Sequence, residues 1–237
     1  MNAALLAPPA RRPAAAWLES GMNLDTEEFL RRYDLLPEVK KAELIEGVVF
    51  MGSPVRIEEH AEPDFILQNW LGTYAFATPG LQGAGNATVR LGPRNAPQPD
   101  ALLRIRPGYG GQSANSDDGY VLGAPELVAE ISASTRSLDL HGKKAAYERL
   151  GVREYLVWSV DDAEVLWFHR LDGAFARLAP EADGVVKSLV FPGLWLDVPA
   201  LLRGDAAAGL ARLQAGLATA EHRAFRDTLA ARKAPAA

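Results

Sequence analysis

The chain of 237 residues contains no cysteine and only four histidines. The absence of cysteine excludes disulfide scaffolds, thiolate zinc sites, iron–sulfur clusters and cysteine nucleophiles. Four histidines leave little material for a histidine-rich metal site. Sulfur-based and imidazole-rich metal chemistry is therefore excluded or disfavoured.

A long apolar run and an excess of positive charge are also missing. No run approaches the ~18 apolar residues of a membrane-spanning helix. Near the N-terminus, Arg11 and Arg12 follow a short apolar stretch, the reverse of a secretory signal, which predicts a cytoplasmic protein with no membrane partner. The net charge of −5 disfavours coating of duplex DNA by charge alone. Any nucleic acid would be held locally, for example through a bound cation.

The composition, with 48% hydrophobic and 23% charged residues, is typical of a globular protein. The length predicts one domain with appendages, or at most two domains. We expect a disordered tail at residues 1–22, a main domain at 23–203 and an Ala-rich C-terminal helix within 204–237. The apolar stripe of that helix predicts docking or dimerisation, so a homodimer is one expected assembly.

Apolar periodicity predicts a mixed α+β fold. The strand–helix–strand order over residues 126–160 indicates a crossover unit, and the polar stretch 106–120 predicts a loop that either contacts substrate or is merely mobile. The expected helices cover 26–36, 58–77 and 139–150, and the expected strands cover 43–52, 87–92, 99–105, 126–132, 152–160, 164–171 and 173–178. Residues 43–52 are expected as a strand or as one arm of a hairpin.

Two acidic residues lie in apolar strand patterns. Glu130 sits within Leu-Val-Ala-Glu-Ile, where a buried carboxylate costs several kcal/mol unless it has a cation, a proton or a metal. Alternation places Glu130 on one strand face with Val128 and Ser132. Asp100 opens the next apolar run, directly after Pro99. For each acid alone, a salt bridge or a turn cap is the competing interpretation.

A lysine and a third acid complete the candidate set. At about 100° per residue, Lys143 falls on the helix stripe that should face the sheet, whereas Lys144 lies roughly 80° off its centre. An inward lysine needs a carboxylate partner or a chemical role. Glu43 begins a strand, where a surface position is equally consistent with the sequence. Carboxylates suit Mg²⁺ or Mn²⁺, which can polarise a phosphoryl oxygen and activate water, and a lysine can orient that water or neutralise the phosphate.

These residues resemble the PD-(D/E)XK restriction-endonuclease-like superfamily, and within it the Uma family of bacterial endonucleases. The resemblance spans about residues 24–200. It is carried by ELIEGVVFMGSP with the following His60, QPDALL, GAPELVAEISASTRSLD, Lys143 with Tyr147, GVREYLVW and FPGLWLD.

The resemblance implies a curved, mostly antiparallel sheet flanked by helices. It implies a divalent metal held by Asp100, Glu130 and the backbone carbonyl of Ile131, with Glu43 at an additional acidic position. Ser132 stands where the superfamily has the lysine of its E-x-K motif, and in this family that lysine lies on the following helix, where this chain has Lys143.

Other residues carry weaker expectations. His60 matches a family position but also suits a structural role, and Asp139 is expected to cap the helix that carries Lys143. Arg136 could touch phosphate or be solvated. The three tryptophans in apolar segments are expected in the core; they are Trp158, Trp167 and Trp195.

The sequence thus predicts a metal-dependent endonuclease acting on DNA, with Asp100, Glu130, Lys143 and Glu43 as its site. Two alternatives remain open. The fold could serve as a non-catalytic scaffold that binds nucleic acid or protein, its acids merely pairing with buried cations. The site could also hydrolyse a small phosphate ester, which the acidic net charge would suit.

Overall fold

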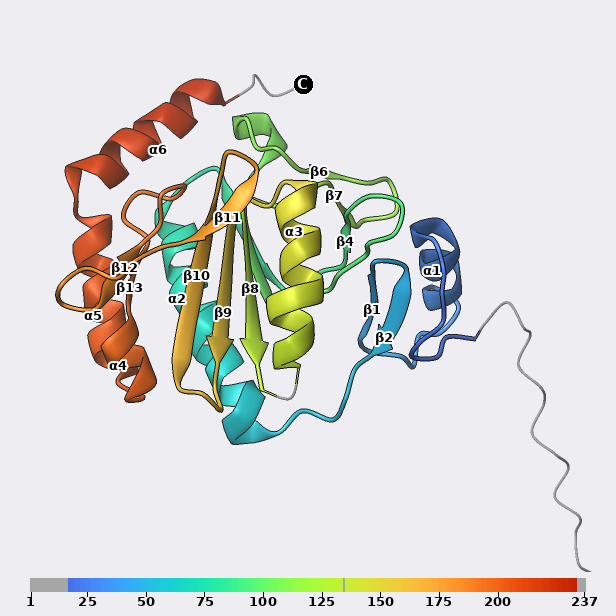
Figure 1. Cartoon of the computed structure of the whole chain (residues 1–237). Helices are drawn as coiled ribbons and strands as arrows, with labels where there is room; N and C mark the ends of the chain where they lie inside the picture. The colour runs from blue at the N-terminus through green and yellow to red at the C-terminus, as the bar shows by residue number, and fades with distance from the viewer. Residues whose placement is uncertain (1–16, 134, 234–237) are drawn as a thin grey trace, which may run out of the picture.

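The computed structural model describes residues 17–133 and 135–233, and a six-stranded sheet forms its centre (Figure 1). The strand order is β11-β10-β9-β8-β5-β3, and every neighbouring pair is antiparallel except β8 and β9. These results confirm a mixed α+β fold with a mostly antiparallel sheet. The strands are β3 (Leu81–Gly85), β5 (Ala101–Ile105), β8 (Leu127–Ser132), β9 (Glu154–Ser159), β10 (Glu164–Leu171) and β11 (Ala174–Arg177).

Helices cover both faces of this sheet (Figure 1). On one face lies α2 (Glu62–Ala77), which continues the short π-helix η2 (Ile57–Ala61). On the other lies α3 (Lys144–Leu150), which continues the π-helix η4 (Leu138–Lys143). Alternate residues of β8 join the two apolar clusters, with Leu127 on the α2 side and Val128 on the α3 side. The predicted crossover unit and the predicted strand faces are confirmed.

The N-terminal part adds α1 (Thr26–Tyr33) and a hairpin of β1 (Ala42–Ile45) and β2 (Val48–Met51). Residues 43–52, predicted as a strand or one arm of a hairpin, contain most of both arms, because Glu46 and Gly47 adopt positive φ values of 52° and 81° and turn the chain back. Residues 1–16 of the expected tail lie outside the described residues. Residues 17–22 differ from a tail, since Leu18 is buried and Gly21 N–H donates to the Val49 carbonyl.

The expected loop at 106–120 contains the 3₁₀-helix η3 (Pro107–Tyr109) and β6 (Ala114–Asn115). β6 pairs with β7 (Val121–Leu122), which pairs in turn with β4 (Val89–Arg90). The buried Arg104 guanidinium donates to the Ala114 carbonyl and so ties this segment to the main sheet.

The C-terminal part packs on the same domain. It begins with the pair β12 (Val185–Lys187) and β13 (Trp195–Asp197), followed by α4 (Val198–Leu202). The single helix predicted here is wrong, because α5 (Ala206–Leu217) ends with Ala218 as its C-cap and a second helix, α6 (Ala220–Arg232), begins after Thr219, whose side chain accepts from His222 N–H. Leu213 and Leu229 are fully buried, so the apolar stripe docks on its own domain.

The structure also tests where the predicted core tryptophans lie and whether any helix could span a membrane. Trp158 and Trp167 lie in the main core, whereas Trp195 is half-buried under the Lys187 ammonium. Among the described residues, no helix has the length and apolar character needed to cross a bilayer.

Candidate active site

The pairing of β5 with β8 places the two predicted metal-binding acids opposite each other. Ala101 pairs with Ala129 in this antiparallel register, so the preceding Asp100 faces Glu130. Both residues are 2% exposed. The Asp100 carboxylate also accepts the Ile131 backbone N–H at 2.8 Å, which fixes it against β8. Residues 30 positions apart in the chain are thereby joined at one end of the two strands.

Lys143 lies at the centre of a closed cluster. Its Nζ is 3.0 Å from Glu130 Oε1, 3.0 Å from Glu43 Oε2 and 3.6 Å from Asp139 Oδ1. Tyr147 donates its hydroxyl to Glu130 Oε1 at 2.9 Å. We define these five residues as the closed cluster; all are buried, and Lys143 is only 4% exposed.

Local periodicity explains how the closed cluster forms. Lys143 and Tyr147 are four residues apart and share one helix face, which turns toward β8, as predicted for Lys143. Lys144 instead lies over the Phe168 ring, 4.8 Å from its centroid. Glu43 reaches the closed cluster from β1. Its Oε2 atom contacts Lys143, and its Oε1 atom accepts the Gln98 backbone N–H at 2.8 Å. Glu43 therefore belongs to the site rather than to the surface.

Asp100 forms the base of a second, open cluster together with Lys41, His60 and Asp64. Lys41 Nζ is 2.7 Å from Asp100 Oδ1, and His60 Nε2 is 3.3 Å from Asp100 Oδ2. The side chains of Lys41 and His60 are 29% and 27% exposed. Asp64, on the first turn of α2, is half-buried. This cluster is the part of the site that solvent reaches.

The two clusters differ in their electrostatics. Burial raises the pKa of Glu130 although Lys143 opposes the shift. Burial would lower the pKa of Lys143, but Glu130, Glu43 and Asp139 together hold it well above its ordinary value. Burial would raise the pKa of Asp100, but the His60 hydrogen bond and the Lys41 charge hold it well below its usual range. Asp100 is therefore a stable carboxylate, whereas Glu130 depends on its cation.

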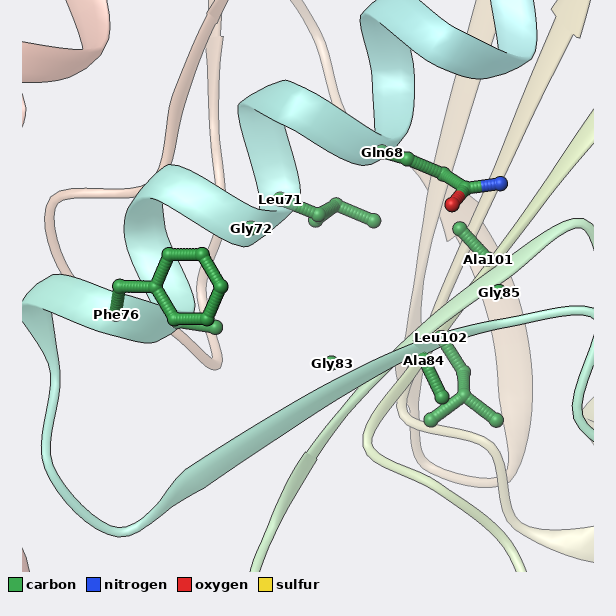
Figure 2. Close-up of a pocket in the computed structure, with 10 residues that line it drawn as sticks. Gln68, Leu71, Gly72, Phe76, Gly83, Ala84, Gly85, Ala101 and Leu102 are labelled. Carbon is green, nitrogen blue, oxygen red and sulfur yellow. The ribbon is translucent and has the colours of Figure 1, made fainter.

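A pocket of about 180 Å³ adjoins the open cluster, between α2 and the strands β3 and β5 (Figure 2). Gln68 marks the end of the pocket nearest the acids, because it donates to Asp64 and lies beside Ala101, the neighbour of Asp100. Phe76, 92% exposed, lies near the opposite end of α2. The pocket gives the open cluster an adjoining concave surface.

Comparison with known proteins identifies the family. The sequence model of the Uma2 family, described as "putative restriction endonuclease", matches residues 26–199. The chain belongs to the Uma2 family. The match runs from α1 to α4 and includes every residue of both clusters.

A solved structure supports the same fold. The chain is similar to the crystal structure titled as a putative nuclease belonging to DUF820 from Anabaena variabilis, with a TM-score of 0.56 and 15% identity over 76% of this chain and 98% of that one. At this identity the likeness establishes the fold alone. A search of curated proteins finds no match.

Within the Uma2 domain, three of the weaker expectations are resolved. Asp139 is not the helix cap, since it lies inside η4, is buried, and accepts from Thr135 Oγ1 at 2.6 Å while facing Lys143. Arg136 pairs with Asp162 at the surface. His60 does lie at the site, in contact with Asp100.

Sequence reasoning missed Lys41 and Asp64. A signal for Lys41 was present, because it lies two residues before Glu43 and alternation along an extended segment puts both on one face. Asp64 gave no comparable signal, since an acidic residue in the first turn of a helix is common.

The donor set of this Uma2 domain fits a hard divalent cation in its chemistry, because two carboxylates from facing strand positions meet beside a backbone carbonyl. Within the described ranges, no three His, Asp or Glu side chains already surround one ion position. Asp100 Oδ1 contacts Lys41, and Glu130 Oε1 contacts Lys143 and Tyr147. Cation binding would thus require the carboxylates to exchange these partners.

Proposed function

We propose that this protein is a metal-dependent endonuclease that hydrolyses phosphodiester bonds, with DNA as its substrate. Asp100, Glu130 and the Ile131 carbonyl would bind Mg²⁺ or Mn²⁺, and Glu43 would support the metal shell. One observation carries the proposal: two buried carboxylates face each other across β5 and β8 in a chain of the Uma2 family. When bound, the metal would polarise a phosphoryl oxygen and lower the pKa of a water molecule.

The backbone of β8 supports the proposed carbonyl ligand. The carbonyls of Glu126 and Ser132 accept from Glu154 and Val160 on the β9 side. Because successive peptide groups of a strand point to opposite sides, the Ile131 carbonyl faces the β5 side, where its N–H already meets Asp100. The three proposed ligands thus share one edge of β8.

In the proposed reaction the water oxygen bonds to phosphorus while the bond to the leaving oxygen breaks. The leaving oxygen takes a proton and becomes a hydroxyl group, and the phosphate stays on the other product. Lys143 would neutralise Glu130 and Glu43 and hold them in place, and its assistance to the attacking water stays a prediction from the sequence. The pocket beside Ala101 would receive the substrate next to the scissile phosphate.

Cleavage of polynucleotides tests this proposal. Purified protein is incubated with plasmid, single-stranded DNA or RNA and with Mg²⁺, Mn²⁺ or chelator. We expect metal-dependent cleavage of DNA, lost in D100A. Absence of cutting on every substrate, or equal cutting by D100A, would contradict the proposal, and cleavage of a small model diester alone would favour the small-ester alternative.

A non-catalytic scaffold is the second candidate function, and the ion pairs favour it. Every carboxylate of the closed cluster approaches the Lys143 ammonium, so the acids are satisfied without metal. Calorimetric titration with Mn²⁺ separates the two candidates. A nuclease of the proposed kind should bind Mn²⁺ and lose this binding in E130Q, whereas a pure scaffold should show no such loss. Homodimer assembly and location in the cytoplasm stay predictions from the sequence.

A further inference from the structure

We infer that Lys41 is a catalytic lysine of this site, whose ammonium donates to a non-bridging oxygen of the substrate phosphate. The inference rests on the proposed nuclease function and adds a residue that the sequence pattern did not indicate. Lys41 and Lys143 are the two lysines paired with acids of the site, and only Lys41 is reachable from solvent, with 29% of its side chain exposed against 4% for Lys143.

The contacts of Lys143 commit it to the carboxylates. Glu43, Glu130 and Asp139 surround its ammonium, which offers three donors in total. A phosphate oxygen would have to displace one of these acids inside a buried cluster, which is costly. Lys143 can therefore hold the acids but is poorly placed to contact substrate.

Lys41 has the opposite surroundings. Its ammonium is 2.7 Å from Asp100 Oδ1 and 3.3 Å from Asn86 Oδ1, and Asn86 is exposed. When Asp100 contacts a divalent cation, the ammonium can leave that oxygen and turn toward an arriving phosphate. A cation and Lys41 thus compete for the same carboxylate oxygen.

The backbone holds Lys41 in this position. Its carbonyl accepts the Gly52 N–H at 3.0 Å, and a Cβ at Gly52 would lie only 3.0 Å from Lys41 Cβ. Lys41 lies directly before β1 and Glu43 lies within it, so this one segment contributes a lysine to Asp100 and an acid to Lys143. The lysine that Ser132 does not provide on β8 would thus come from the residue directly before β1.

The test compares K41A and K41R with K40A in the full chain. Lys40 is the matched control, because it is the adjacent lysine and its Nζ contacts the Pro37 carbonyl instead of an acid of the site. Two readouts are taken for each variant: the affinity for Mn²⁺ by calorimetry and kcat/KM for cleavage of plasmid DNA.

We expect K41A to lower kcat/KM about 100-fold, in line with the loss of one charge-stabilising donor. The kcat/KM of K41R should be at least about tenfold higher than that of K41A. We expect K41A to bind Mn²⁺ about fivefold more tightly, since a partly exposed competing ion pair is removed. K40A should match the wild type in both readouts.

A loss of kcat/KM smaller than tenfold in K41A, or Mn²⁺ affinity that is unchanged or weaker, would overturn the inference. Failure of the underlying function gives a different pattern, in which the wild type itself cuts no substrate. The affinity readout then still tests whether Lys41 competes for Asp100.

Discussion

The closed and open clusters use the same two kinds of group, carboxylates and lysines, with different exposure. In the closed cluster, Lys143 is buried among three acids and only 4% exposed. In the open cluster, Lys41 and His60 pair with Asp100 while remaining more than a quarter exposed. The difference separates a group that holds the site together from groups that can exchange a partner for an incoming ligand.

The largest expected effect is on stability, in the closed cluster. K143M leaves buried carboxylates without their cation, and we expect the free energy of unfolding to fall by about 3–5 kcal/mol. The same change in the open cluster, K41M, should cost less, since the His60 ring and the Ile131 N–H still contact the Asp100 carboxylate. Urea unfolding of both variants measures the contrast, and equal losses would remove the distinction between the clusters.

The next effect concerns cleavage and depends on the acid shared between the proposed metal and Lys41. D100N should lower kcat/KM on plasmid DNA about 10²–10³-fold, which corresponds to about 3–4 kcal/mol. D117N, which changes an exposed loop acid, should leave the rate unchanged. A D100N rate within threefold of the wild type would exclude Asp100 from the chemistry.

A smaller expected effect on the free energy of unfolding tests whether Glu130 is charged in the closed cluster. Y147F removes a hydroxyl that donates to the Glu130 carboxylate, and we expect a loss of about 1.5–3 kcal/mol. Y155F removes a hydroxyl that donates to the neutral Asp139 carbonyl, and a loss of about 1 kcal/mol is expected. Urea unfolding of both variants measures the two losses, and a Y147F loss no larger than that of Y155F would contradict a charged, buried Glu130.

The smallest effect is a pH dependence of the open cluster. The Asp100 hydrogen bond raises the pKa of His60 above its ordinary value of 6.5. Protonated His60 therefore contributes stability below about pH 6.5, and this contribution is lost as the pH rises through the raised pKa. We expect the wild-type unfolding free energy to fall more than that of H60Q between pH 6 and 8.

The exposed His141 supplies the control for this pH dependence. H141Q should keep the wild-type profile, because nothing in the closed or open cluster contacts that ring in the described part of the chain. A profile that is the same for the wild type, H60Q and H141Q would show that His60 does not stabilise the folded state through Asp100.

The parts of the site predicted from sequence rest on local periodicity. Alternation along β8 identifies the strand face of Glu130, and the helical stripe directs Lys143 inward. Both patterns need only a few neighbouring residues and a regular backbone. The family motifs predict more of the site than periodicity does, because they relate residues in distant segments of the chain.

The missed features depend on contacts between distant segments or on irregular backbone. The pairing of Lys41 with Asp100 joins the residue before β1 to the residue before β5, 59 positions later in the chain. Asp139 lies inside a helix whose first turn already begins at Arg136, so it faces Lys143 from within the helix instead of capping its start. The C-terminal helix divides near Gly216, where a Cβ would lie 2.2 Å from the Gly193 carbonyl oxygen, a tertiary constraint that no local pattern carries.

Calorimetric titration with Mn²⁺ tests the central claim most directly, because it asks whether Asp100 and Glu130 share one cation. We predict one site per chain in the wild type, lost in both D100N and E130Q and retained in the exposed-acid variant E58Q. No binding by the wild type, or binding that survives either substitution at the paired acids, would contradict the account.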